Sequence, residues 1–206
     1  MNTKPLDSID SYVSNQRDYN EVQHNSFFVE LAKRNLRRYL KVLEDWEIAP
    51  SSLLDAGCRE GYILSEAEEA LGGLLKRPVG LDIVPEFIKT CEDLYGFECH
   101  LGDIHEMPFD NQEFDSVYCS QTLEHAYDVS KAASELFRVA KKSVFIGVPI
   151  EDLQSFVANK SHYIRANSEL EWFKLIDPIP PHWKLVHVFR NKETPYLNMI
   201  FLREEL

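Results

Sequence analysis

Short apolar segments alternate with helical patterns through most of the chain after residue 50. Five brief apolar segments predict strands: SLLDAG, PVGLDI, FECHLGD, FDSVYCS and SVFIGVP. Most of them are separated by segments with a helical pattern: YILSEAEEALGGLL, PEFIKTCEDLYG and DVSKAASELFRVAKK. Alternation of this kind indicates a parallel sheet. A later helix, SELEWFKLI, and two apolar runs, HWKLVHVFR and YLNMIFLRE, predict a final hairpin that adds an antiparallel strand. We therefore expect an α/β fold with a doubly wound, mostly parallel sheet and helices on both faces.

Several predicted helices carry signals for their ends. Pro85 in the first turn and Gly96 beyond the last turn fit one helix. Asp128 is a predicted N-cap, and Ser168 with Glu171 forms a predicted capping box. These signals support the positions of three helices independently of their apolar pattern.

The length of 206 residues suits one domain. Residues 1–18 are polar and predict a poorly ordered tail. Residues 19–48 have apolar residues at helical spacing, which predicts one long helix or two short ones. Within the single domain, 19–206, we expect a ligand-binding core at 50–150. The last part, 151–206, would supply a loop, a helix and the hairpin on the side of the second substrate.

The net charge of −12 disfavours broad attraction to nucleic acid. No apolar run approaches the roughly 20 residues that span a bilayer, so we expect no membrane segment and a cytoplasmic protein. The four cysteines have no CxxC spacing, which argues against a zinc cluster or a disulfide framework: Cys58, Cys91, Cys99 and Cys119. His100 and His105 lie near acidic residues, but no second cluster completes a ligand set, so we expect no metal.

The loop after the first predicted strand begins and ends with glycine. Ligands of open parallel sheets bind beyond the carboxyl ends of the strands, so Gly57 to Gly61 is expected in the site. A dinucleotide loop needs a central glycine next to the pyrophosphate, whereas this loop has Arg59 there, and Glu60 would repel the pyrophosphate. A ligand with an amino-acid group, a ribose and an adenine but no phosphate suits such a loop, as S-adenosylmethionine does. We expect Arg59 and Glu60 to point mostly outward.

Acidic residues at strand ends support this ligand. Asp82 ends the second strand, where it would accept hydrogen bonds from both ribose hydroxyls, although capping of the next helix is the alternative. Asp103 ends the third strand and would accept from the adenine amine, with Ile83 and Ile104 packed on the ring. Asp55 has two open interpretations, a ligand contact or a carboxylate that stabilises the loop.

The segments LDAGCREG, GLDIVPEFI, GDIHEMPF and FDSVYCSQTLEH occur in this order. The set resembles the class I S-adenosylmethionine-dependent methyltransferases, in particular the compact methyltransferase-domain type, over about residues 50–150. The resemblance implies a Rossmann-like fold, S-adenosylmethionine as cofactor and S-adenosylhomocysteine as product. Arg59 departs from the usual middle glycine, so it would change the backbone path or reach toward the methionyl carboxylate. Cys119, Ser120 and Gln121 would line the sulfonium side. The full implied cofactor-binding set is Asp55, Ala56, Gly57, Cys58, Arg59, Gly61, Asp82, Ile83, Asp103, Ile104, Cys119, Ser120 and Gln121.

The acceptor site has weaker signals. His125 is a candidate base or a structural residue, and His162 with Tyr163 is a candidate pocket wall or a packed surface loop. His24 lies in a segment that commonly covers the cofactor in the resembling family, with a solvent-facing role as the alternative. The basic residues Arg34, Arg37, Arg38 and Lys41 suit a solvated helix face better than an acidic acceptor.

We expect a small-molecule acceptor; the acceptor atom (O, N or C) and the oligomeric state stay open. A non-catalytic interaction module, with cofactor affinity lost through Arg59, is a second hypothesis. A third is an NAD-dependent oxidoreductase, because Asp82 also suits an NAD ribose.

Overall fold

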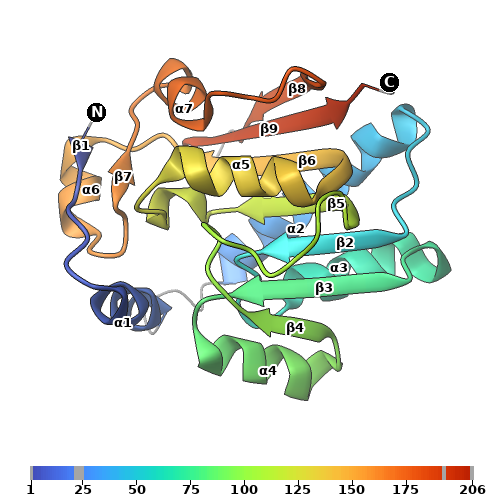
Figure 1. Ribbon diagram of the computed structural model, residues 1–206, viewed down its shortest axis with the longest axis horizontal. Coiled ribbons are helices and arrows are strands. Elements are labelled where there is room, and N and C mark those ends of the chain that lie inside the picture. Colours follow the sequence, from blue (N-terminus) through green and yellow to red (C-terminus); the bar gives the residue numbers. More distant parts are fainter. Residues whose placement is uncertain (1, 21–25, 192–193, 205–206) are drawn as a thin grey trace.

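A computed structural model describes residues 2–20, 26–191 and 194–204, without the side chains of residues 2, 18–20 and 26–28. Its centre is a seven-stranded sheet in the order β4-β3-β2-β5-β6-β9-β8 (Figure 1). The five parallel strands are β2 (Ser52–Ala56), β3 (Arg77–Asp82), β4 (Glu98–Leu101), β5 (Phe114–Ser120) and β6 (Ala140–Pro149). The antiparallel hairpin consists of β8 (Trp183–Arg190) and β9 (Tyr196–Arg203), and β9 pairs with β6. The predicted α/β fold is thus confirmed, including the antiparallel C-terminal strand.

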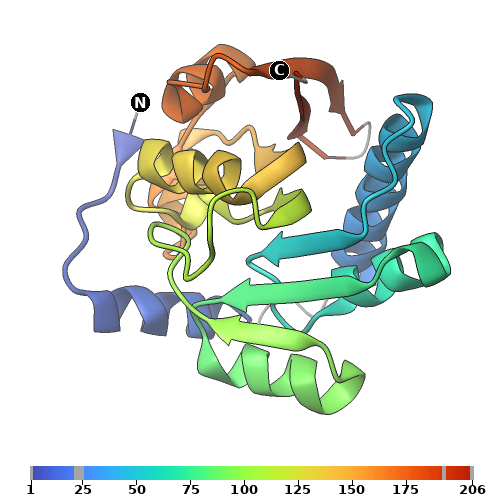
Figure 2. The same ribbon diagram turned by 45° about the vertical axis from the view of Figure 1, so that its right-hand side comes forward.

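Helices cover both faces of this sheet (Figures 1 and 2). One face packs against α2 (Ser26–Asp45) and α3 (Tyr62–Leu71), and α4 (Pro85–Tyr95) follows at the β4 edge. The other face packs against α5 (Val129–Val139) and α7 (Glu169–Ile176). The indole of Trp172 lies fully buried in this second layer and donates to the Pro149 carbonyl at 2.6 Å. The polar atom of the largest core side chain is therefore satisfied.

The predicted helix ends agree with the structure. Asp128 caps α5 by accepting from the Lys131 amide at 3.0 Å. Ser168 accepts from the Glu171 amide at 3.3 Å, as in a capping box, whereas the Glu171 carboxylate accepts from the Asn167 amide at 2.8 Å and not from that of Ser168. Gly96 ends α4 in a left-handed conformation with φ +71°.

The N-terminal residues differ from the expected poorly ordered tail. Residues 2–20 contain β1 (Asn2–Thr3) and α1 (Ile9–Asn20), and β1 pairs with β7 (Ile164–Arg165). Tyr12 anchors the segment because its ring is 4% exposed and makes edge contacts with two other tyrosines. Tyr12 is the one buried aromatic residue among the described side chains of α1, and one such residue in a polar sequence gives little apolar pattern, so the sequence did not predict this helix. A further short helix, α6 (Leu153–Ala158), precedes β7.

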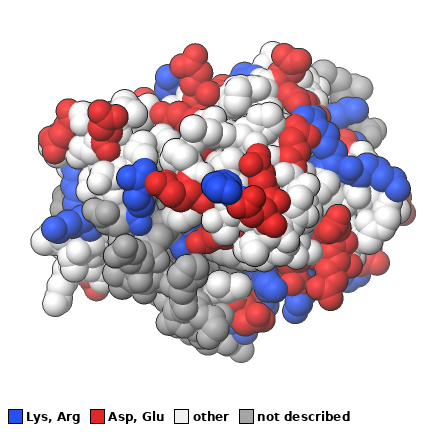
Figure 3. All heavy atoms as spheres, turned by 90° about the horizontal axis from the view of Figure 1, so that it is seen from below, with Lys and Arg blue, Asp and Glu red and all other residues white. Residues whose placement is uncertain are grey.

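The helical segment predicted for 19–48 appears as α2, while His24 lies outside the described residues. None of the helices in the described part of the chain combines the length and apolar character that a membrane crossing requires. On the face shown in Figure 3, the described basic and acidic side chains are interspersed.

Candidate active site

The carboxyl ends of β2, β3 and β5 open into a cavity of about 570 Å³. This volume lies within the range of small-ligand sites in proteins. The loops after these strands form its inner wall, and α1 with the segment 149–162 lines the opposite side. The cavity therefore lies where the topology of an open parallel sheet places a ligand.

The glycine loop after β2 needs both of its glycines for geometric reasons. Gly57 has φ +88°, and a Cβ there would lie 2.2 Å from Oγ1 of Thr122. Gly61 has φ +85°, and a Cβ there would lie 2.4 Å from Sγ of Cys91. A larger residue at either position would force the loop away from the strands, so the loop holds its path by close backbone packing.

Arg59 and Glu60 do not point outward as expected. Their side chains are 23% and 15% exposed, and Nε of Arg59 lies 3.4 Å from Oε2 of Glu60. Arg59 adopts φ +49°, lies 5.7 Å above the Phe87 ring and lines the cavity. Its amide donates to Oδ2 of Asp82 at 3.0 Å, which keeps the loop against β3 despite the missing glycine. The expectation was wrong because the two opposite charges compensate each other at the cavity edge.

Two buried carboxyls lie side by side at the ends of β2 and β3. Burial raises the pKa of Asp82 to about 6, while hydrogen bonds from the amides of Val84 and Arg59 partly oppose this effect. Burial, followed by the neighbouring Asp82, raises the pKa of Asp55 well above its usual range. No hydrogen bond to the Asp55 carboxyl is recorded within the described residues, so the structure offers little support for a loop-stabilising role.

The third carboxyl, Asp103, already has protein partners. Its Oδ1 accepts from the His105 amide at 2.9 Å and contacts His105 Nδ1 at 2.5 Å, and its Oδ2 accepts from Tyr127 at 3.2 Å. Burial alone would raise the pKa of Asp103, but these hydrogen bonds outweigh it and lower the pKa. His105 thus contacts both Asp103 and Tyr127. The tyrosine ring stacks on the imidazole of His105, with 3.6 Å between the ring centroids.

Most of the residues predicted from the sequence line this cavity: Asp55, Gly57, Cys58, Arg59, Asp82, Ile83, Asp103, Ile104, Ser120, Gln121, His125 and His162. Four predicted residues are not among the lining residues: Ala56, Gly61, Cys119 and Tyr163. Cys119 is fully buried inside β5, where side chains alternate between the two faces of the sheet. Tyr163 is also buried, and its hydroxyl accepts from Nδ2 of Asn15 at 3.1 Å.

A compact group of polar side chains lies on the side of the cavity away from Asp82. Glu124 and His125 come from a short helix, Leu123–His125, that follows β5, and His162 comes from the loop after α6. The imidazoles of His125 and His162 are 4.8 Å apart in an edge-to-face arrangement. Burial raises the pKa of Glu124 to about 7, and the neighbouring His162 partly opposes this rise. Burial lowers the pKa of His125 to about 3, and His162 adds to this decrease.

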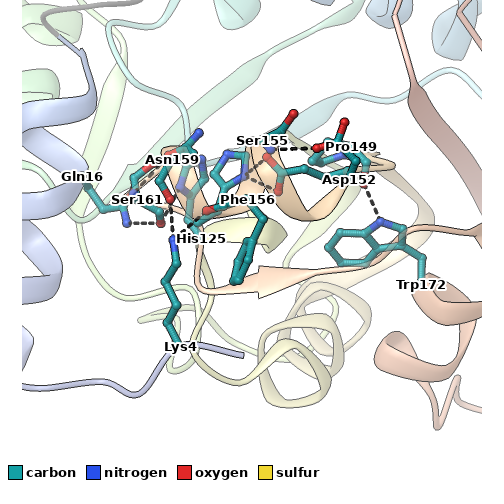
Figure 4. A network of polar contacts seen from close by, with 12 residues as sticks. Lys4, Gln16, His125, Pro149, Asp152, Ser155, Phe156, Asn159, Ser161 and Trp172 are labelled. Atoms are coloured by element: carbon teal, nitrogen blue, oxygen red, sulfur yellow. Dashed lines mark hydrogen bonds and ion pairs between the residues drawn. The ribbon is translucent and has the colours of Figure 1, made fainter. Parts of the chain in front are cut away.

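Hydrogen bonds join this group to the N-terminal segment. Figure 4 shows Lys4, Gln16 and His125 converging on the segment that carries Asn159 and Ser161. Nδ1 of His125 and Nε2 of Gln16 both contact the Ser161 carbonyl, at 3.0 and 3.1 Å. Nζ of Lys4 donates to the Phe156 carbonyl at 3.0 Å. The outer wall is therefore one connected unit, although its two parts are about 150 residues apart.

Sequence reasoning missed many of the lining residues, among them Tyr12, Gln16, Tyr62, Phe87, Glu124 and Glu151. Of these, only Glu124 had a signal, because it belongs to the same LEH segment as His125.

The basic residues of α2 include Arg37, which pairs with the buried Glu66 at 2.5 Å, and Lys41, which pairs with Glu44 at 2.8 Å. These ion pairs agree with a solvated helix face.

Residues 54–146 match the methyltransferase domain family. The match runs from β2 into β6 and so includes the glycine loop and all three strand-end carboxyls. Among solved structures, a chain from the complex between the Haloferax volcanii Trm112 methyltransferase activator and a methyltransferase has a TM-score of 0.71 at 16% identity, covering 98% of this chain and 100% of that chain. The plantazolicin methyltransferase BpumL, in complex with S-adenosylhomocysteine, has a TM-score of 0.68 at 13% identity, covering 97% and 92%.

Curated relatives match only in part. The malonyl-(acyl-carrier protein) O-methyltransferase of Erwinia billingiae is 32% identical over 88 residues, 42% of this chain and 34% of that protein. The sterol 24-C-methyltransferase erg6 of Schizosaccharomyces pombe is 33% identical over 106 residues, 48% of this chain and 27% of that protein. The chain spans about a third of the length of the first curated relatives that it matches. The fold is that of S-adenosylmethionine-dependent methyltransferases, and the comparisons support the class I family and S-adenosylmethionine as the cofactor.

Proposed function

We propose that this protein transfers a methyl group from S-adenosylmethionine to a small-molecule acceptor and releases S-adenosylhomocysteine. The observation that carries the proposal is the cavity at the carboxyl ends of β2, β3 and β5, built around a tightly packed glycine loop and the buried Asp82. It lies within the segment that matches the methyltransferase domain family. When bound, the cofactor supplies an electrophilic methyl group on its sulfonium sulfur.

The buried carboxyls suit a ligand with hydroxyl and amine groups. Each oxygen of Asp82 accepts one backbone hydrogen bond and retains a lone pair for a ribose hydroxyl. Asp103 retains a lone pair for the adenine amine on Oδ2, which accepts from Tyr127 only, whereas Oδ1 already contacts both the amide and Nδ1 of His105. Under this proposal Ile83 and Ile104 pack against the adenine ring, and both line the cavity.

The opposite end of the cofactor would lie near the glycine loop and the end of β5. Asp55, Gly57 and Cys58 are the proposed neighbours of the methionyl group, and Ser120 and Gln121 those of the sulfonium. Gln121 adopts φ +57°, a conformation uncommon for a residue other than glycine, and its amide donates to the Gly147 carbonyl at 2.8 Å. The backbone at this point is therefore held firmly at the cavity.

We propose that the chain contributes mainly alignment and desolvation. Methyl transfer is a displacement in which correct placement of the reacting atoms supplies much of the rate. A general base works best with a pKa near the working pH, and the low pKa of His125 disfavours that role. His162 remains the candidate for acceptor contact, whereas the buried Tyr163 supports the wall behind it.

The acceptor would enter between the glycine loop and the outer wall formed by α1 and the segment 149–162. The two curated relatives named above act on different atoms, since their names describe an O-methyltransferase and a C-methyltransferase. The proposal therefore does not name an acceptor atom. A small acceptor suits a cavity of about 570 Å³, and the net charge of −12 argues against nucleic acid.

Calorimetric titration tests the proposal. S-Adenosylmethionine and S-adenosylhomocysteine should each bind to the wild type with one site, and NAD should not bind. Asp82→Ala should abolish binding, while Asp93→Ala, which removes an exposed carboxylate paired with Lys89, should leave it unchanged. Absence of binding by folded wild type would refute the proposal and favour an interaction module. Binding of NAD alone would favour an oxidoreductase.

A further inference from the structure

The polar group on the outer wall contains a ligand set for a cation. One oxygen or nitrogen atom from each of Glu124, His125 and His162 lies within 4.8 Å of the others. We propose that these three side chains bind a divalent transition-metal cation of the zinc type. The sequence predicts no metal site. Here His162 lies 37 residues after His125, so the three side chains meet only in the folded chain.

Both histidines are oriented as metal ligands usually are. The Ser161 carbonyl can only accept, so Nδ1 of His125, 3.0 Å away, donates to it. Nδ1 of His162 lies 3.0 and 3.1 Å from the two carboxylate oxygens of Glu151, which likewise accept. In its neutral form, each ring then has its lone pair on Nε2. Metal-binding histidines typically donate their other ring nitrogen to a carboxylate or a backbone carbonyl, and this site shows one of each.

The carboxylate ligand has an oxygen that the described residues leave without a hydrogen bond. Glu124 is 1% exposed, and its Oε2 is buried without a partner in the described part of the chain. An unsatisfied buried carboxylate oxygen is costly and calls for an ion or a bound water. Beside the two imidazoles, Glu124 is buried and the side chain of Glu151 is 9% exposed, so a divalent cation would compensate negative charge on these carboxylates.

The backbone holds the two ligand-bearing segments together. The Tyr163 amide donates to the Glu124 carbonyl at 2.9 Å, which joins the residue after His162 to the residue before His125. The side chains would need to close by about 1.5 Å or less to reach the spacing of zinc ligands. Rotation of side chains on a fixed backbone supplies a movement of this size.

The ligand types select the kind of cation. Two imidazoles and one carboxylate suit zinc and related transition metals, whereas magnesium and calcium prefer oxygen ligands. Three protein ligands leave a coordination position open toward the cavity, which all three residues line. An acceptor with a hydroxyl or carboxylate oxygen would occupy that position, and this step rests on the proposed function. The cation site itself does not depend on the proposed function.

Cobalt(II) titration of the chelator-treated, untagged full chain tests the site. The visible absorption of bound cobalt reports an ordered site with nitrogen and oxygen ligands, and zinc should displace it with a stoichiometry of one. Glu124→Gln and His162→Asn should each weaken cobalt binding at least tenfold, as expected for loss of one ligand. The matched control is His100→Asn, since His100 also contacts a carboxylate, Glu98 at 2.9 Å, but outside the cavity.

Each result decides between the alternatives. Cobalt binding lost in the two ligand variants and kept in His100→Asn supports the site. No cobalt or zinc binding by folded wild type, or equal binding in all variants, overturns it and leaves a hydrogen-bonded polar network. Thermal melting identifies a variant that fails to fold, and the other variant then decides. Titration with S-adenosylhomocysteine in parallel separates this result from the proposed function, because cofactor binding without metal binding would refute the cation site alone.

Discussion

The buried Asp82 carboxyl should make stability depend on pH in a way that asparagine would remove. Burial raises its pKa to about 6 from an ordinary value of 3.8. A carboxyl with a raised pKa in the folded state contributes stability below its unfolded-state pKa, and this contribution is lost as the pH rises through the folded-state pKa. It is therefore absent at pH 8. At pH 5, one unit below the folded-state pKa, it amounts to about 1.4 kcal/mol, and its limit at lower pH is about 3 kcal/mol.

Urea unfolding of wild type and Asp82→Asn at pH 5 and pH 8, without cofactor, measures this contribution. Asparagine does not titrate, and its altered hydrogen bonds change the free energy of unfolding by a similar amount at both pH values. On going from pH 8 to pH 5, wild type should therefore gain about 1.4 kcal/mol relative to the variant. Asp93→Asn, at an exposed position, serves as the control and should follow wild type. An equal difference between wild type and Asp82→Asn at the two pH values would show that burial does not perturb this carboxyl.

Three further predictions concern the cavity. Gly57→Ala places a Cβ 2.2 Å from Oγ1 of Thr122 at φ +88°, so it should abolish S-adenosylhomocysteine binding and lower stability by about 1–3 kcal/mol. In the control variant Gly73→Ala the added Cβ meets nothing within 4 Å, so this variant should bind S-adenosylhomocysteine normally. Equal affinities of Gly57→Ala and Gly73→Ala for the ligand would contradict the packing argument. Affinity for S-adenosylhomocysteine should fall about tenfold from pH 7 to pH 5 as Asp82 takes up a proton near pH 6, and constant calorimetric affinity would exclude an ionised Asp82 from the contact. Tyr12→Ala removes a buried ring and should cost about 3–5 kcal/mol, measured by denaturation; an unchanged free energy of unfolding would mean that α1 does not pack on the domain.

The sheet was predictable from the sequence because its strands are short apolar runs with turn residues at their ends. The helix caps at Asp128 and Ser168 were also predictable, because a cap depends on residues only a few positions apart. α1 was not, since its polar sequence is held by tertiary contacts of Tyr12 with Tyr127 and Tyr163. Local patterns contain no information about such distant partners.

The inner wall of the site was more predictable than the outer wall. Topology places the carboxyl ends of neighbouring parallel strands together, so the sequence predicts that Asp55, Asp82 and Asp103 lie at one site, and all three line the cavity. The orientation of Arg59 was not predictable, because it depends on Phe87 and the compensating Glu60. The outer wall joins residues 4–16 to residues 149–162, and only the folded chain shows which polar groups meet there.

The most direct test of the central claim is the structure of the protein with S-adenosylhomocysteine bound. We expect the ribose hydroxyls within hydrogen-bond distance of the Asp82 carboxylate and the adenine between Ile83 and Ile104. The amino-acid end should lie against the loop between Gly57 and Gly61. Electron density for the ligand outside this cavity, or in the cavity without contact to Asp82, would contradict the account.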